Sequence, residues 1–272
     1  MARRDALLEV AADLVERDGV DGLTMAALGE ASDYATASLY TYFPSRSALL
    51  AALQRRALAT LAEVAAERLA AWDHALTQLQ PRPAPRVRSL ARLWAFSDLF
   101  LSAPDRHPRE FRLQQQLLVT PGAEDTADAA SVVPAAMVVL DVPRRLLDAA
   151  AERRALSPGD ATTDPVGAPL DPTLLRTFAW IVALNGALMV DGLSTGLPST
   201  GPALGSELTA TLLRGWGARE RDLIAARELA HTLDQAPAAP GTPDPAHESD
   251  PAGPADPASA ADPSGTTPGA HP

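Results

Sequence analysis

The sequence predicts an all-α protein, and three observations support this fold class. Alanine and leucine are abundant, whereas aromatic residues make up only 4% of the 272 residues, a composition that favours helices over strands. Apolar residues recur at intervals of three and four positions along most of the chain, as they do on one face of a helix. No segment reads as a convincing strand. The hydrophobic content of 46% is sufficient for a substantial core.

Four helices are expected near the N-terminus. They cover residues 3–18, 25–31, 35–42 and 46–79. Gly19 follows the first helix, where a glycine readily ends a helix, and Thr24 is a suitable N-cap for the second. Ser32 and Asp33 form a tight connection to the third helix, and Pro44 stops that helix. The fourth helix is long, because nothing in it interrupts the helical pattern.

Longer helices are expected in the rest of the chain, separated by proline-rich connections. They cover residues 86–102, 108–119, 126–156, 173–193 and 203–233. Pro134 and Pro143 are expected to kink or split the third of these. From Asp234 onward the chain has no Leu, Ile, Val or aromatic residue, so it cannot bury enough apolar surface to fold. We therefore expect a domain of residues 1–50, a larger helical domain of residues 51–233 and a disordered Pro/Ala/Asp-rich tail of residues 234–272.

Composition argues against several classes of protein. There is no cysteine, which excludes disulfides, thiolate metal sites and cysteine nucleophiles. His74 and His107 have no second ligand at suitable spacing, so no metal site and no cofactor are expected. The N-terminus does not read as a signal peptide, and no apolar run is long enough to span a membrane. These features indicate a soluble, cytoplasmic protein without a membrane partner.

The short helices at the N-terminus form the pattern of a helix-turn-helix. In this motif the second helix crosses the DNA backbone and the third lies in the major groove. Leu39 and Phe43, four positions apart, are expected to face the core of the domain. The opposite face of the third helix is then small and polar, and it presents residues Thr36, Ala37, Tyr40 and Thr41.

The segment "LTMAALGEASDYATASLYTYFPSRSALLAAL" resembles the DNA-binding region of the TetR family of transcriptional regulators. The resemblance covers about residues 7–53, and its most specific part is the run Leu-Tyr-x-Tyr-Phe-Pro-Ser-Arg at residues 39–46. Two departures are visible. Ser32-Asp33 stands where the family has a small residue followed by glycine, and Arg46 stands where it has a lysine. Aspartate tolerates the left-handed conformation of that turn better than most residues, and arginine keeps the positive charge.

The resemblance implies a set of DNA contacts. The hydroxyls of Tyr40 and Tyr42 and the guanidinium of Arg46 would bind phosphates, and Thr24 would cap its helix beside the DNA backbone. Thr36, Ala37 and Ser38 would occupy the base-reading positions. The predicted DNA-contacting residues are Thr24, Thr36, Ala37, Ser38, Tyr40, Thr41, Tyr42 and Arg46. The first sixty residues hold six arginines and eight acids, so non-specific DNA binding is expected to be weak.

The resemblance also implies that the C-terminal part binds a small effector and forms a homodimer. The segments "FAWIVALNGALMVDGL" and "ELTATLLRGW…LIAARELAHTL" would pair across a two-fold axis. A pocket for a mainly apolar ligand would lie between the middle helices and the helix of Trp180. The candidate pocket residues are Trp94, Phe100, Phe111, Gln115, Trp180, Asn185 and Met189. For each of these residues, packing in the core is the alternative role. The family's usual activity is repression of a palindromic operator.

Two other classes of function were weighed against this one. A TetR-like protein that has lost DNA binding and acts as an interaction module would fit the net charge of −11. A helical enzyme would need a catalytic motif, and the sequence has no nucleophile elbow, P-loop, HExxH or paired carboxylates on one helix face. We therefore expect a DNA-binding regulator and not an enzyme.

Overall fold

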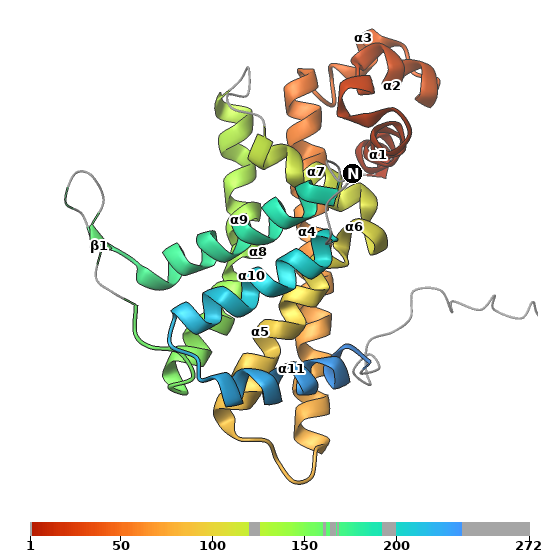
Figure 1. The fold of residues 1–272 in the computed structure, drawn as a ribbon. Helices are drawn as coiled ribbons and strands as arrows, with labels where there is room; N and C mark the ends of the chain where they lie inside the picture. Colours follow the sequence, from red (N-terminus) through yellow and green to blue (C-terminus); the bar gives the residue numbers. More distant parts are fainter. Residues whose placement is uncertain are drawn as a thin grey trace, which may run out of the picture. The chain divides into compact units, whose positions relative to one another are not determined.

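The computed structural model describes residues 2–119, 126–159, 162–163, 167, 169–191 and 200–235 of the chain. The described residues are almost entirely helical, which confirms the predicted all-α class (Figure 1). The helices are α1 (Ala2–Gly22), α2 (Met25–Ser32), α3 (Thr36–Leu39), α4 (Arg46–Gln78), α5 (Pro85–Leu101), α6 (Ala103–Arg106), α7 (Pro108–Val119), α8 (Thr126–Glu152), α9 (Pro172–Asp191), α10 (Gly201–Gly215) and α11 (Glu220–Asp234). The predicted disordered tail lies outside the described residues from residue 236 onward.

Residues Met1–Ala239 form one compact unit that contains two main hydrophobic cores. The N-terminal core joins α1, α2 and α3 to the start of α4, and it includes Leu14, Leu39 and Phe43. The central core joins α5, α8, α9, α10 and α11 to the far half of α4. Helix α4 belongs to both, because Leu53 is buried in the first core and Trp72 in the second. It therefore connects the helix-turn-helix segment to the rest of the unit (Figure 1).

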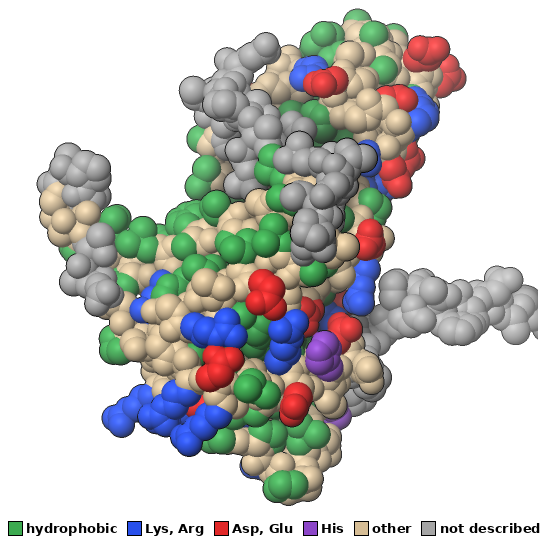
Figure 2. Space-filling view, in the orientation of Figure 1, with side chains coloured by type: hydrophobic (Ala, Val, Ile, Leu, Met, Phe, Trp, Pro, Cys, Tyr) green, Lys and Arg blue, Asp and Glu red, His purple; other side chains and the backbone are tan. Residues whose placement is uncertain are grey.

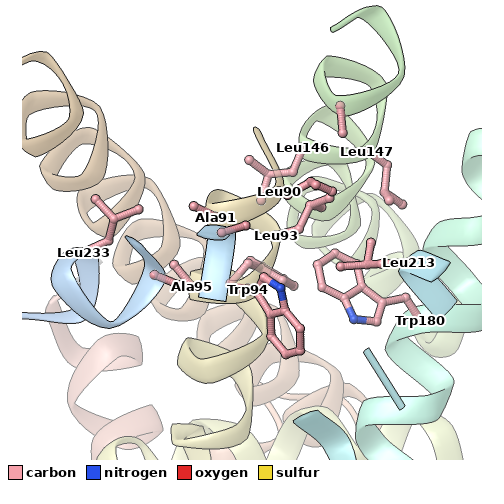
Figure 3. Close-up of a cluster of buried hydrophobic side chains, with 14 of the residues drawn as sticks. Leu90, Ala91, Leu93, Trp94, Ala95, Leu146, Leu147, Trp180, Leu213 and Leu233 are labelled. Carbon is pink, nitrogen blue, oxygen red and sulfur yellow. The ribbon is translucent and has the colours of Figure 1, made fainter. Parts of the chain in front are cut away.

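Helix α5 is the innermost helix of the central core. It packs against α4, α8, α9, α10 and α11. Figure 3 shows Leu93 and Trp94 of this helix facing Trp180 of α9 and Leu213 of α10. The burial of large side chains from five helices around α5 makes this core the main source of hydrophobic stabilisation.

The structure differs from the expected helix boundaries at three places. The helix expected over residues 203–233 is broken between α10 and α11, where Gly217 adopts a left-handed φ of 94°. A Cβ at Gly217 would lie 2.2 Å from Ser157 Oγ, so this close approach requires glycine. Helix α3 is only four residues long, and residues 40–42 continue as turns. Helix α8 runs through Pro134 and Pro143 without splitting.

Two small elements were not predicted. Helix α6 is a single turn between α5 and α7. Strands β1 (Thr162–Thr163) and β2 (Pro169–Leu170) pair antiparallel in the connection between α8 and α9. Two-residue strands leave almost no periodic signal in a sequence.

Helix α9 is unusually apolar. Among the described residues, its segment Pro172–Val190 is the one helix long and apolar enough to cross a membrane by length and composition alone. Such a helix is weak evidence for a membrane span, because core helices of soluble proteins pass the same test. Here Trp180 and Leu184 are fully buried in the central core, which accounts for one face of α9.

Candidate nucleic-acid interface and apolar cavity

The turn between α2 and α3 is built from local interactions that the sequence encodes. Thr24 Oγ1 accepts a hydrogen bond of 3.0 Å from Ala27 N and caps α2, as predicted. Asp33 ends α2 in the left-handed conformation, with φ 56° and ψ 37°. At Gly29 a Cβ would lie 2.9 Å from Tyr34 O, so the close approach of α3 to α2 depends on this glycine. These features fix the angle at which α3 leaves α2.

The residues predicted to read DNA bases form an exposed face on α3. Leu39 and Phe43 are buried at 0% and 1% exposure, as predicted, and they anchor this segment in the N-terminal core. Thr36, Ala37 and Ser38 are exposed on α3, and Tyr40 and Thr41 are exposed just after it. Tyr42 is half-buried and packs against the N-terminal core. The segment therefore presents a small, polar surface on a fixed support.

Arg46 has a structural role that the sequence analysis missed. Its Nε donates a 2.5 Å hydrogen bond to Leu23 O, and an Nη donates a 2.7 Å hydrogen bond to Val20 O. These bonds join the start of α4 to the connection between α1 and α2. The side chain remains exposed, but two of its donors are used within the protein. We therefore regard Arg46 first as a residue that positions the helix-turn-helix.

Several of the acids counted in the N-terminal domain face α7 and not α3. Arg109 of α7 lies 2.8 Å from Asp13, 3.0 Å from Glu16 and 3.4 Å from Glu9, all three on α1. The hydrogen bond that Arg109 donates to Glu16 raises the pKa of Arg109 above its already high value. These three carboxylates are therefore paired with Arg109, away from the α3 face. The summed charge of the domain thus overstates the repulsion between α3 and a phosphate backbone.

An apolar cavity of about 170 Å³ lies between α4, α5, α7, α8 and α9. Its walls include Leu58 and Leu61 of α4, Phe100 of α5 and Phe178 of α9. Three polar side chains also line it, namely Arg106, His107 and Gln114. A mainly apolar cavity with a few polar groups is the usual form of a small-molecule site.

The structure separates the seven predicted pocket residues into two groups. Phe100 and Phe111 line the cavity, and their rings are 5.8 Å apart at 82°. The other five are not among the lining residues: Trp94, Gln115, Trp180, Asn185 and Met189.

Three of these five residues are buried elsewhere in the core, and Met189 is exposed on the surface. Trp94, Trp180 and Asn185 are buried in the packed interior. The Trp180 indole donates a 3.0 Å hydrogen bond to Thr209 Oγ1, and Asn185 Nδ2 donates to Ile181 O. Met189 points outward with 56% exposure. Among the Gln residues at positions 114–116, Gln114 faces the cavity, which sequence periodicity alone could not select.

One face of α9 is exposed and entirely apolar. We call it the α9 stripe, and it consists of Leu175, Phe178, Ala179, Val182, Gly186 and Met189. Figure 2 shows hydrophobic side chains gathered along this helix. By contrast, α11 buries its apolar residues against α5 and exposes Ile224. A contiguous apolar patch of this kind marks an interaction surface more often than isolated residues do.

Asp98 on α5 is a half-buried carboxyl group beside α11. Burial raises the pKa of Asp98 above its ordinary value, against the opposing attraction of His231 and Arg227, while Asp234 adds to the rise. Because the pKa of Asp98 is higher in the folded state, this group favours the folded state most below its ordinary pKa of 3.8. The contribution of Asp98 to the free energy of unfolding is lost as pH rises through the folded-state pKa. Ionised Asp98 therefore destabilises the fold at neutral pH.

Replacing Asp98 with asparagine is thus expected to raise the midpoint of thermal unfolding at pH 7. The gain should shrink towards zero as pH is lowered well below the ordinary pKa of 3.8, where the wild-type carboxyl is protonated in both states. Thermal unfolding at several pH values measures this, with the exposed Asp105→Asn as the control. A less stable Asp98→Asn variant at pH 7 would mean that attraction to Arg227 and His231 outweighs the cost of burial.

No group of three or more His, Asp or Glu side chains in the described part of the chain is arranged to hold a metal ion. The α3 face, the cavity and the α9 stripe are the features of the described residues that suit binding.

Comparisons with known proteins agree with this arrangement. Residues 7–53 match the family model for bacterial regulatory proteins of the tetR family. A search of curated proteins gave no match. A protein of unknown function from Rhodococcus sp. RHA1 is 25% identical, with a TM-score of 0.52, and the match covers 78% of this chain and 94% of that chain.

SmeT has a similar structure. It is the repressor of the Stenotrophomonas maltophilia multidrug efflux pump SmeDEF, and it is 18% identical with a TM-score of 0.51 over 80% of this chain and 92% of SmeT. A SmeT-triclosan complex matches with 18% identity and a TM-score of 0.52, over 82% of this chain and 94% of that chain. At this identity the likeness establishes the fold alone. The N-terminal domain is therefore that of the tetR family of bacterial regulatory proteins, and the chain shares the fold of solved regulators such as SmeT.

Proposed function

We propose that the protein is a homodimeric repressor that binds a palindromic operator through α3 and releases it when a small, mainly apolar ligand enters the cavity. The observation that carries this proposal is the exposed polar face of α3, held by Leu39 and Phe43 within a TetR-type helix-turn-helix. SmeT, with the same fold, is a repressor and has been solved with triclosan. Such a regulator would act in the cytoplasm.

The dimer would form through the α9 stripe. A two-fold axis would place two copies of this apolar face against each other and bury side chains such as Phe178 and Val182, which are 44% and 61% exposed in the single chain. The two α3 helices must then lie about 34–36 Å apart to enter successive major grooves. The apolar pattern of the last helix predicted that it also belongs to this interface, but α11 uses most of its apolar residues to cover α5.

Helix α7, like α4, connects the ligand cavity to the helix-turn-helix. Phe111 and Gln114 of α7 line the cavity. On another side of α7, Arg109 pairs with acids of α1, and Arg112 donates hydrogen bonds of 3.1 and 2.9 Å to Val15 O and Glu16 O. A ligand that favours one position of α7 would thereby favour one position of α1. This is how occupation of the cavity would change the spacing of the two α3 helices.

The DNA-binding part of the proposal is tested with Ala37→Glu on the exposed face of α3. A carboxylate there would face DNA phosphates and is expected to weaken operator binding by about a hundredfold, since like charges brought together cost several kcal/mol. Ala37 is exposed, so the fold should be unaffected. Fluorescence anisotropy on DNA from upstream of the protein's own gene, against a scrambled duplex, measures the effect.

The control is Ala66→Glu, the same substitution at an exposed alanine on α4 outside the helix-turn-helix. It should bind DNA as the wild type does. Equal binding by Ala37→Glu and the wild type would contradict the proposed role of α3. A wild-type protein that never selects DNA, even from genomic fragments, would favour the alternative of an interaction module.

A further inference from the structure

One residue that lines the cavity has a buried polar atom without a hydrogen-bond partner among the described residues. Gln114 Oε1 is shielded from solvent and makes no hydrogen bond within the described part of the structure. His107, Phe111 and Gln114 are spaced at i, i+4 and i+7, so they share the face of this segment that lines the cavity. A buried carbonyl oxygen without a donor is unfavourable. Rotation of the Gln114 amide would bring this oxygen to the cavity surface, where a ligand with an O–H group would supply the donor. A hydroxyl can also accept a hydrogen bond from the amide.

The size of the cavity limits the body of the ligand. Its volume is about 170 Å³. An engineered apolar cavity of about 150 Å³ in another protein binds benzene. The present cavity therefore accommodates a single six-membered ring with one or two small substituents. A second ring would have to extend past Phe178 and Val182, where the wall is exposed, and would be less well buried.

The walls favour a planar aromatic ring. Phe100 and Phe111 already pack edge to face, at 82°. Phe178 contributes a third phenyl ring to the lining. Aromatic rings prefer edge-to-face and offset contacts with one another, and such contacts add to the gain from burial of apolar area. A saturated ring of the same size would gain the burial but not these contacts.

From these three observations we propose that the ligand is a single-ring phenol whose hydroxyl donates a hydrogen bond to Gln114 Oε1. This inference rests on the proposed function only in taking the cavity as the effector site. Arg106 and His107 lie at the polar part of the same wall, so a second hydroxyl or a similar small polar substituent would have partners there.

The test measures binding directly, without DNA. Isothermal titration calorimetry on the full chain compares p-cresol with toluene, which has the same ring and methyl group but no hydroxyl. The wild type is expected to bind p-cresol at least about tenfold more tightly, since toluene would leave Gln114 Oε1 unpaired. In Gln114→Leu, p-cresol and toluene should bind with about equal affinity.

Gln115→Leu is the matched control, because Gln115 is the adjacent residue on α7 and does not line the cavity. It should keep the wild-type preference. Cyclohexanol and 4-phenylphenol test shape and size, and both should bind more weakly than p-cresol. If Gln114→Leu does not fold, as judged by circular dichroism, the wild-type comparison of the four compounds still decides the question.

Three results would overturn the assignment: toluene binding as tightly as p-cresol, 4-phenylphenol binding more tightly than p-cresol, or an unchanged preference in folded Gln114→Leu. Failure of the proposed function is recognised separately. A protein that shows the expected p-cresol preference but whose DNA complex is unaffected by p-cresol would retain the phenol site and lose the repressor mechanism.

Discussion

Replacing Trp180 with alanine is expected to lower the free energy of unfolding by about 3–5 kcal/mol. The Trp180 side chain is fully buried among five helices, and its ring lies 5.3 Å from that of Phe96. Its indole also donates to Thr209 Oγ1, which is 2.9 Å from Ser97 Oγ in a buried pair of hydroxyls. The substitution would therefore leave a large void and remove a donor from a buried polar group. Urea unfolding followed by circular dichroism measures the loss.

Trp216→Ala is the matched control for this prediction. Trp216 is half-buried after α10, and Arg176 lies over its ring at 5.5 Å. Its removal should cost only about 1–2 kcal/mol, because a smaller apolar area returns to water. Equal losses from the two substitutions would contradict the assignment of Trp180 to the centre of the core.

Replacing Met189 with glutamate is expected to raise the dissociation constant of the proposed dimer by at least about a hundredfold. Met189 lies on the α9 stripe and is 56% exposed in the single chain, so the change should not disturb the fold. In the dimer each copy would bury an unpaired carboxylate, which costs several kcal/mol. Analytical ultracentrifugation measures the dissociation constant. Because a monomer cannot bind both half-sites of the operator at once, the protein concentration needed for operator binding should also rise.

Ile224→Glu provides a control of the same chemistry and exposure, since Ile224 is also 56% exposed but lies on α11. It should leave the dimer intact. A monomer produced by Ile224→Glu, together with a dimer that survives Met189→Glu, would place the interface on α11 and not on α9.

The local structure of the N-terminal domain could be predicted because each feature depends on a few adjacent residues. The cap at Thr24 requires only a hydroxyl three positions before a backbone N–H. The left-handed turn at Asp33 depends on the conformational tolerance of that one residue. The burial of Leu39 and Phe43 follows from helical spacing. Such signals are readable without knowledge of distant contacts.

The residues of the cavity were harder to predict because they depend on how each helix is rotated. Helix α9 is apolar on nearly every side. Its sequence therefore does not indicate that Trp180 faces the core, or that Phe178 of the exposed α9 stripe also forms part of the cavity wall. The same ambiguity applies to consecutive glutamines, where a rotation of about 100° separates Gln114 from Gln115. The role of Arg46 was missed for a related reason, because its carbonyl partners lie more than twenty positions away.

The attachment of α1 to α7 implies that ionic strength acts on this protein at two places. The ion pairs around Arg109 are partly exposed, so they weaken as mobile ions shorten the Debye length, which is about 10 Å at 0.1 M. The hydrogen bonds from Arg112 to backbone carbonyls are less sensitive to such screening. Added electrolyte is therefore expected to loosen one of the two attachments while it also displaces the proposed contacts to DNA phosphates. The dependence of operator binding on electrolyte concentration would then reflect two quantities. One is the strength of the attachment of α1 to α7, and the other is the number of phosphates contacted.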